Sequence, residues 1–528
     1  MHASPRPQIH AGEIAALCGA AALIIGACFF VSQKQLFSLD EMLTALTVSQ
    51  HSFAAMLSSL KDEINAMPPL YFAAGWCWVK VFGASEFSLR LPSALAISLA
   101  LVCVWDGLRG FTNRWVAVLC SIGIPLLCWE IRRAAFDARP YGWYFAAYSL
   151  AFALYVRSAE ETTTTGRWSI WVVLTHATLV AIHYVGGLFS ALLVAAAFAT
   201  WIFDGDRRYL RHGVNAAIGW LALIPSVPFY LAQRKLATEL SWLERPDLSD
   251  LLESFTCGID GFPLIATSLL CTLLLVASLR APDLAMASRP HLPGGLRPAA
   301  ILSMLSLLFL PAIWLESQWG ARLFLLRYLS PTLICWACAM GWAGNWLLAQ
   351  CQTSQDRAPA ANQTTAWDQR LSVRRRWLTV AVTLGFLGLP VVAATARFCL
   401  DLVRLGKKVR RPETILSVIQ KHPDLPVLTG TPQDLTMAAF YLHDRTRVSM
   451  VLESREPDSS LHQRFGTALE RHFFPNSITQ LGPFLASTDR FLFVDRKLAY
   501  VPFMAEHAEL AGQSITGDIW LWERRDQR

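Results

Sequence analysis

Residues 14–31 read IAALCGAAALIIGACFFV, and residues 37–41 read Phe37-Ser38-Leu39-Asp40-Glu41. The first segment carries no charge over a length that can cross a bilayer, because a spanning helix needs roughly 17 to 25 apolar residues. No small-residue cleavage site follows it, so we interpret it as a retained span and not as a removed signal peptide. Asp40 and Glu41 are therefore expected just outside a membrane, either as solvated charges or as acid/base groups.

The composition extends this interpretation to the whole chain. Its 528 residues are 54% hydrophobic and 16% charged, with a mean hydropathy of +0.37. This is too apolar for a soluble protein of such a size, and we predict an α-helical polytopic membrane protein. The net charge of +7 comes from short arginine clusters between apolar runs, where a role in membrane topology is simpler than nucleic-acid binding. We expect no nucleic-acid partner.

The cysteines give no sign of a metal centre. Most of the twelve lie inside apolar runs, and none has CxxC or Cys/His metal spacing. We therefore expect packing residues, with no disulfide framework, no zinc site and no certain cofactor. The sequence leaves open whether a divalent metal takes part.

Eleven apolar stretches are long enough to span a bilayer. They are 13–31, 89–108, 115–131, 139–156, 168–183, 185–203, 212–232, 261–279, 298–316, 328–349 and 377–397. A twelfth, 67–82, begins with Pro68-Pro69, carries Lys80 and is short. If the N-terminus is cytoplasmic and 67–82 only dips into the surface, every inner loop is basic, as the positive-inside rule requires. This predicts eleven spans, or twelve if 67–82 crosses, and favours an outer C-terminus.

The chain divides by composition near residue 400. We predict a membrane domain over 1–400, whose first outer loop, 32–88, holds juxtamembrane helices, including an amphipathic one from Asp40 to Leu60. Residues 401–528 are predicted to be a small soluble α/β domain outside the membrane. Its expected strands are 426–429, 447–452, 491–494 and 519–522, and its expected helices are 434–443 and 461–473. It has no phosphate-binding loop or catalytic triad, so we expect no chemistry there.

On this topology several polar residues share the outer face. They are Asp40, Glu41, Asp137, Arg139, Tyr141, His183, Tyr184, Arg322, Arg327 and Tyr328. Arginines outside the membrane oppose the positive-inside rule, and an anionic ligand at the outer surface would explain them. Each group also has a simpler explanation.

The simpler explanations are structural. The carboxylates of residues 40–41 can complement a helix dipole. Residues 137–141, DARPY, can be an ion pair at a helix start. His183-Tyr184 can be an interfacial aromatic pair, and Arg322 and Arg327 can be snorkelling cations.

Taken in order, these motifs resemble the bacterial relatives of protein O-mannosyltransferases and aminoarabinose transferases, which are GT-C fold glycosyltransferases of family 39. The resemblance rests on Asp40-Glu41, MPPLYF at 67–72, FGASEFSLRLPSAL at 82–95, DARPY at 137–141, His183-Tyr184 and Arg327-Tyr328. It covers the membrane part to about Pro331. Two positions depart from it: Met67 stands where relatives often have His, and Phe136-Asp137 stands where they commonly have Gln-Glu.

The resemblance implies a polyprenyl-phosphate sugar donor. A hexosyl or pentosyl group would pass, with inversion, to a hydroxyl of a lipid, glycan or protein on the periplasmic face of a bacterial inner membrane, in lipopolysaccharide or protein glycosylation. Asp40 falls on the catalytic acid, Glu41 on its neighbour and Asp137 on the second acidic position. Arg139, Arg322 or Arg327 would hold the phosphate, with Tyr141, His183, Tyr184 and Tyr328 as further substrate-binding residues.

Two other functions stay open. The main alternative is a transporter or flippase of lipid-linked sugars, although the predicted spans are nearly free of charge at their centres, where transporters place ionisable residues. A non-catalytic assembly protein with a periplasmic domain is the third.

Overall fold

The computed structural model describes residues 9–62, 64–158, 166–238, 244–256, 259, 295–320, 322–356, 388, 390–404, 410–442, 445–451, 459–494, 510–516 and 518–524. They form two compact units that interleave along the chain. The helical unit comprises Met1–Phe29, Arg90–Ser226 and Trp242–Leu402, and the sheet unit comprises Phe30–Leu89, Val227–Ser241 and Val403–Arg528. The predicted domains 1–400 and 401–528 follow the chain instead and stay a prediction.

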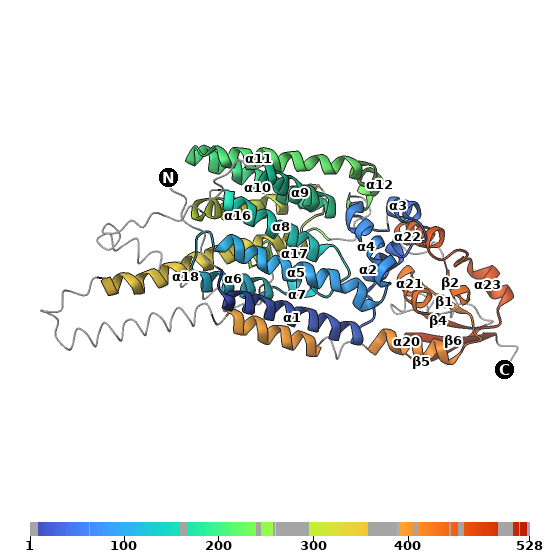
Figure 1. Cartoon of the computed structure of the whole chain (residues 1–528). Coiled ribbons are helices and arrows are strands. Elements are labelled where there is room, and N and C mark those ends of the chain that lie inside the picture. Colours follow the sequence, from blue (N-terminus) through green and yellow to red (C-terminus); the bar gives the residue numbers. More distant parts are fainter. Residues whose placement is uncertain are drawn as a thin grey trace, which may run out of the picture. The chain divides into compact units, whose positions relative to one another are not determined.

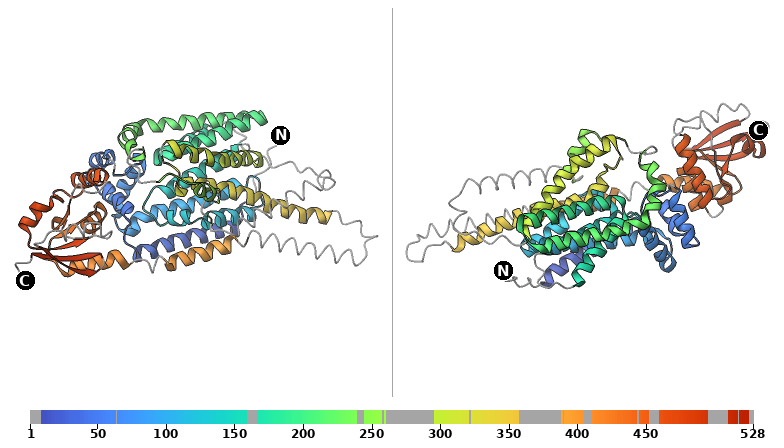
Figure 2. Two further views of the ribbon diagram at one scale, coloured as in Figure 1. Left: turned by 180° about the vertical axis from the view of Figure 1, so that it is seen from behind. Right: turned by 90° about the horizontal axis from the view of Figure 1, so that it is seen from above.

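The helical unit contains apolar helices, several of which run side by side (Figures 1 and 2). In chain order they are α1 (Ala11–Lys34, ending in the sheet unit), α5 (Glu86–Leu108, starting in the sheet unit), α6 (Arg114–Leu127), α7 (Trp129–Ala134), α8 (Tyr141–Arg157), α9 (Gly166–Ile182), α10 (Tyr184–Asp204), α11 (Arg207–Gly219), η2 (Trp220–Ser226), α13 (Leu248–Thr256), α16 (Leu296–Trp319), α17 (Leu326–Leu329), η3 (Ser330–Thr332) and α18 (Leu333–Asp356). Residues 390–404 are also helical.

These helices confirm a polytopic membrane protein. Five helical segments in the described part of the chain are long and apolar enough to cross a bilayer: Ala11–Lys34, Glu86–Leu108, Tyr184–Asp204, Arg207–Arg234 and Leu296–Trp319. Arg114–Leu127 and Gly166–Ile182 are shorter apolar helices. Helices make up most of the predicted spans where the structure describes them, but the predicted span 115–131 is broken at Cys128 into α6 and α7. Residues 261–279 and the first part of 377–397 lie outside the described residues.

The sheet unit begins with helices from the first predicted outer loop, α2 (Leu39–Val48), α3 (Phe53–Lys61) and α4 (Pro69–Phe82). The single helix predicted from Asp40 to Leu60 is wrong. The chain breaks after α2, and Ser52 starts a new helix because its Oγ accepts a hydrogen bond from the Ala55 amide at 3.1 Å. α4 has 14 residues, so its length of about 21 Å is short of the roughly 30 Å of a bilayer core.

The rest of the sheet unit is an α/β fold with α12 (Val227–Thr238) beside the outer-loop helices. Its elements are α20 (Arg410–Lys421), β1 (Val427–Thr429), α21 (Pro432–Tyr441), η4 (Arg445–Arg447), β2 (Val448–Val451), α22 (Ser459–His472), β3 (Ile478–Thr479), α23 (Leu481–Ser487), β4 (Arg490–Val494), β5 (Leu510–Thr516) and β6 (Ile519–Arg524). The strand order is β3-β2-β1-β4-β6-β5. The first four strands are parallel to one another, while β6 is antiparallel to both β4 and β5.

The predicted strands and helices of this domain are confirmed, but the sequence missed two strands. β3 is only two residues long, and β5 carries Gly512, Gln513 and Ser514, a composition that does not indicate a strand. Gly512 pairs with Trp522, and a Cβ there would lie 2.8 Å from the indole ring. The glycine therefore makes room for the aromatic ring of β6.

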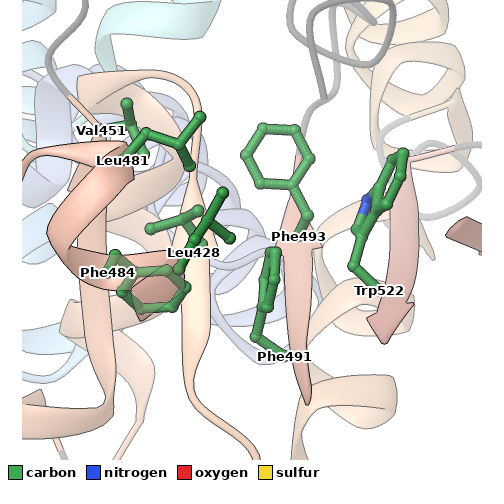
Figure 3. Close-up of a cluster of buried hydrophobic side chains, with 8 residues drawn as sticks. Leu428, Val451, Leu481, Phe484, Phe491, Phe493 and Trp522 are labelled. Atoms are coloured by element: carbon green, nitrogen blue, oxygen red, sulfur yellow. The ribbon is translucent and has the colours of Figure 1, made fainter. Parts of the chain in front are cut away.

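One apolar cluster stabilises this sheet (Figure 3). Phe491 and Phe493 point to the same face of β4 because side chains alternate along a strand. They meet Leu428 of β1 and Trp522 of β6, and α23 covers them with Leu481, Phe484 and Leu485. Phe491 is fully buried.

We expect Phe491→Ala to destabilise the sheet unit by about 3–5 kcal/mol, because it removes a fully buried ring and leaves a cavity. Pulse proteolysis in urea, with fragments from residues 410–524 followed by mass spectrometry, measures this loss. Ile515→Ala on β5 is the control, since Ile515 is 38% exposed and its truncation should cost much less. Equal losses for the two variants would contradict the assigned core.

Candidate active site

The turn from α7 into α8 brings the DARPY motif against α5. Pro140 is the N-cap of α8, so a helix start at this motif is confirmed. A Cβ on Gly142 would lie 3.1 Å from the Ser93 carbonyl oxygen and 3.3 Å from the Ala134 carbonyl oxygen. Glycine therefore lets the first turn of α8 approach the backbones of α5 and α7 closely.

A buried ion pair fixes α7. The Arg132 Nε donates to Asp401 Oδ2 at 2.6 Å, and its NH1 donates to the carbonyl oxygens of Leu126 at 2.8 Å and Leu127 at 2.7 Å. Arg132 is 1% exposed. One guanidinium thus satisfies the carbonyls at the end of α6 and ties α7 to the helix at 390–404.

Arg139 lies in the turn between these helices. Its amide donates to the Asp137 carbonyl oxygen at 2.8 Å, and its own carbonyl accepts from Ser93 Oγ at 3.3 Å. The arginine side chain is buried and Asp137 is partly buried. These hydrogen bonds fix the backbone at Asp137 and Arg139, and a fixed backbone suits a residue that positions a substrate.

Four of the predicted site residues meet in one cluster. The Arg327 guanidinium carbon lies 5.1 Å from the ring centroid of Tyr141 and 5.5 Å from that of Tyr328. The His183 ring centroid lies 5.0 Å from that of Tyr328 and 5.8 Å from that of Tyr141. Aromatic rings attract a cation through their faces, so the rings orient the Arg327 guanidinium, and it keeps its positive charge.

Tyr144 completes this cluster, and the sequence analysis missed it. Its hydroxyl donates to the Tyr328 carbonyl oxygen at 3.0 Å, and its ring stacks on His183 with centroids 5.3 Å apart. The signal was present in its spacing, because Tyr144 follows Tyr141 by three residues and shares its helix face.

The tautomer of His183 follows from its place at the start of α10. Its Nδ1 caps the helix by accepting from the Val185 amide at 3.2 Å, so the proton of the neutral ring is on Nε2. Burial, together with the charges of Arg139 and Arg327, lowers the pKa of His183 to about 3. Its Nε2 is buried without a hydrogen-bond partner among the described residues. The ring is thus a neutral donor among cations.

Glu130 is a second residue that the sequence analysis did not single out. It lies on α7, beyond the end of the apolar α6. Burial raises the pKa of its carboxyl, against the positive charges of Arg133 and Arg327, and Glu253 of α13 adds to the rise. The structure therefore places one carboxyl group, that of Glu130, in the electrostatic field of Arg327.

Asp40 and Glu41 belong to the sheet unit, at the start of α2. Glu41 is buried and forms a capping box, in which its Oε2 accepts from the Ser38 amide at 2.9 Å while its own amide donates to Ser38 Oγ at 3.4 Å. Asp40 is partly exposed, and its carbonyl oxygen accepts from Thr44 Oγ1 at 3.0 Å. Glu41 therefore has a structural task, and the Asp40 carboxylate is the more accessible of the two.

The remaining predicted residues lie in the helical unit. Tyr184 is the first residue of α10, and Arg322 precedes α17 in a partly buried position. No group of three or more His, Cys, Asp or Glu that could hold a metal ion is found within the described ranges.

Comparison with solved structures identifies the fold. ArnT from Cupriavidus metallidurans bound to undecaprenyl phosphate matches with a TM-score of 0.58 at 14% identity, covering 97% of this chain and 98% of that chain. Its apo form matches with a TM-score of 0.58 at 15% identity, covering 97% of each chain. The apo oligosaccharyltransferase of Archaeoglobus fulgidus matches with a TM-score of 0.53 at 11% identity, covering 97% of this chain and 74% of that chain. The chain therefore has a GT-C fold.

Sequence comparisons add no family. No family model matches the chain. No curated protein matches it either.

We expect Asp401→Leu to destabilise the helical unit by about 3–5 kcal/mol, because it leaves the buried Arg132 charge without its carboxylate. Thermal unfolding of the purified protein in detergent measures this. The double variant R132M/D401L should recover part of the loss, since no buried charge remains. Arg133→Met on the same helix is the control, because Arg133 is exposed and should change stability by less than about 0.5 kcal/mol. Similar losses at Asp401 and Arg133 would refute the structural role of the pair.

Proposed function

We propose that the protein is a lipid-linked glycosyltransferase of the family 39 type that uses a polyprenyl-phosphate sugar. The observation that carries the proposal is the cluster of Arg327, His183 and the tyrosines in a GT-C fold. A phosphodiester between apolar helices needs charged and neutral donors that are already oriented, and this cluster supplies both. The similar ArnT structure contains undecaprenyl phosphate, a lipid of the same class.

In the proposed reaction, the Asp40 carboxylate takes the proton of an acceptor hydroxyl. The acceptor oxygen then forms a bond to the anomeric carbon on the face opposite the phosphate. The bond from the anomeric carbon to the phosphate oxygen breaks, and its electron pair leaves with the polyprenyl phosphate. The product is an inverted glycoside, and the leaving lipid gains one negative charge.

The arginines would stabilise that charge. We assign Arg139, Arg322 and Arg327 to the phosphate, with His183 Nε2–H as a neutral donor. Tyr141, Tyr184 and Tyr328 would contact the donor, and Asp137 would act as the second acid near the acceptor. The transferred sugar would be a hexose or pentose, and the acceptor a lipid, glycan or protein hydroxyl. The reaction would take place on the periplasmic face of the inner membrane.

We expect Asp40→Asn to lower single-turnover transfer by about 10²- to 10⁴-fold without weakening donor binding, because the amide cannot accept the proton. Glu41→Gln should be milder, since glutamine also accepts the Ser38 amide in a capping box. Transfer from radiolabelled polyprenyl-phosphate sugars and donor affinity are measured on both variants. Near wild-type turnover in the Asp40 variant would falsify the role of Asp40 as base. It would favour the view that Asp40 and Glu41 only stabilise the first turn of α2.

We expect Ala at Arg139, Arg322 or Arg327 to raise the donor KM by about 10-fold or more, because each change removes charged hydrogen bonds to the phosphate. Arg114→Ala, at the exposed start of α6, is the matched loss of a cation and should leave KM unchanged. If the donor KM stays normal in all three variants, the phosphate binds elsewhere. Movement of intact labelled lipid between leaflets, without covalent transfer, would instead identify a flippase.

A further inference from the structure

The α/β domain of the sheet unit, residues 410–524, has no chemistry assigned to it. It does form a hydrogen bond with the segment that leads into α2. The Phe37 amide donates to the Tyr441 hydroxyl at 2.7 Å, and this hydroxyl donates to Glu86 Oε1 at 3.1 Å. Tyr441 is the last residue of α21, and Glu86 is the first residue of α5. One hydroxyl thus joins the entry to α2, the start of α5 and the end of α21.

Ring packing supports the same contact. Phe37 is 5% exposed, and its ring makes a T-shaped contact with the ring of Phe440, with centroids 5.9 Å apart. Phe440 in turn packs against Tyr441 with centroids 4.9 Å apart. The last turn of α21 therefore fixes the position of Phe37 through its backbone and its side chain.

Asp40 follows Phe37 by three residues, and the structure between them is rigid. Ser38 and Glu41 close a capping box around the first turn of α2, so this turn moves as one piece. A displacement of Phe37 would carry Asp40 with it.

The other ends of α2 and α3 are held by α22. The Gln50 Nε2, just after α2, donates to the His472 carbonyl oxygen at 3.1 Å. Asp62, just after α3, accepts from Arg471 NH1 at 2.7 Å and from His472 Nε2 at 2.6 Å. Burial would raise the pKa of Asp62, but the hydrogen bonds and charges of His472 and Arg471 lower it overall. The α2–α3 pair is therefore anchored at both ends to helices of the α/β domain.

We propose that the α/β domain positions Asp40 for the reaction, with Tyr441 as the positioning residue. This inference rests on the proposed function, because it assigns Asp40 a place in catalysis. A base must lie within about 2.6–3.2 Å of the atom whose proton it takes. A shift of about 1 Å can cost on the order of 10²-fold in rate. Donor binding is assigned to other residues, so loosening α2 should affect turnover and not donor affinity.

The test uses the full-length protein in lipid nanodiscs with Tyr441→Phe, which keeps the ring and removes the hydroxyl. We expect kcat to fall by about 10- to 100-fold at unchanged donor KM. Amide exchange over residues 37–43 should become faster. Glu86→Gln keeps an oxygen acceptor for the hydroxyl and should retain most of the turnover. Tyr230→Phe, a half-exposed tyrosine on α12 of the same unit, is the matched control and should change neither readout.

The outcomes separate the two proposals. Faster exchange over 37–43 with normal kcat would overturn the positioning role and leave only a packing contact. Unchanged exchange and unchanged kcat would overturn the contact as well. A lower kcat together with a higher donor KM would also count against the positioning role of Tyr441, because the effect would not be specific to the base. A wild-type protein that transfers no sugar refutes the proposed function itself, whatever the exchange data show.

Discussion

The constraint on which the rest of the structure depends is the hydrogen bonding of backbone groups where apolar helices stop. Water is scarce beside such helices, so a broken helix must find protein partners for its free groups. The Arg132 guanidinium is the hydrogen-bond partner of the carbonyl oxygens at the end of α6. Trp336 Nε1 donates to the Phe255 carbonyl oxygen in the last turn of α13 at 2.7 Å. At these two helix ends, polar side chains of other elements satisfy the carbonyl oxygens.

Several candidate site residues lie at other helix ends. His183 caps α10, and the DARPY turn separates α7 from α8. A capping or turn residue is already fixed by the backbone that it satisfies, so little entropy is lost when it also binds a ligand. This suits a candidate site whose residues include His183 at the start of α10 and Arg139 just before α8.

The sequence predicts local features well and long-range partners poorly. Apolar length indicates the membrane spans, and short apolar runs indicate β1, β2, β4 and β6 of the sheet. The bonds that place the candidate site join residues far apart, such as Phe37 with Tyr441, 404 residues away, and Arg132 with Asp401, 269 residues away. No local pattern marks such partners. Glu41 is different, because Ser38 followed three residues later by Glu41 is a local capping-box pattern that the sequence does contain.

The balance of charge in the cluster supports the case for an anionic ligand. Arg139 is buried, and its charge and that of Arg327 both act on His183, which stays neutral. A protonated His183 would add a third cation to a buried site. The neutral ring adds a hydrogen-bond donor without adding positive charge. Tyr141 and Tyr328 orient Arg327 through their ring faces, which attract the cation without neutralising it. The proposed phosphate ligand would suit such a site, because it brings negative charge and several acceptor oxygens together.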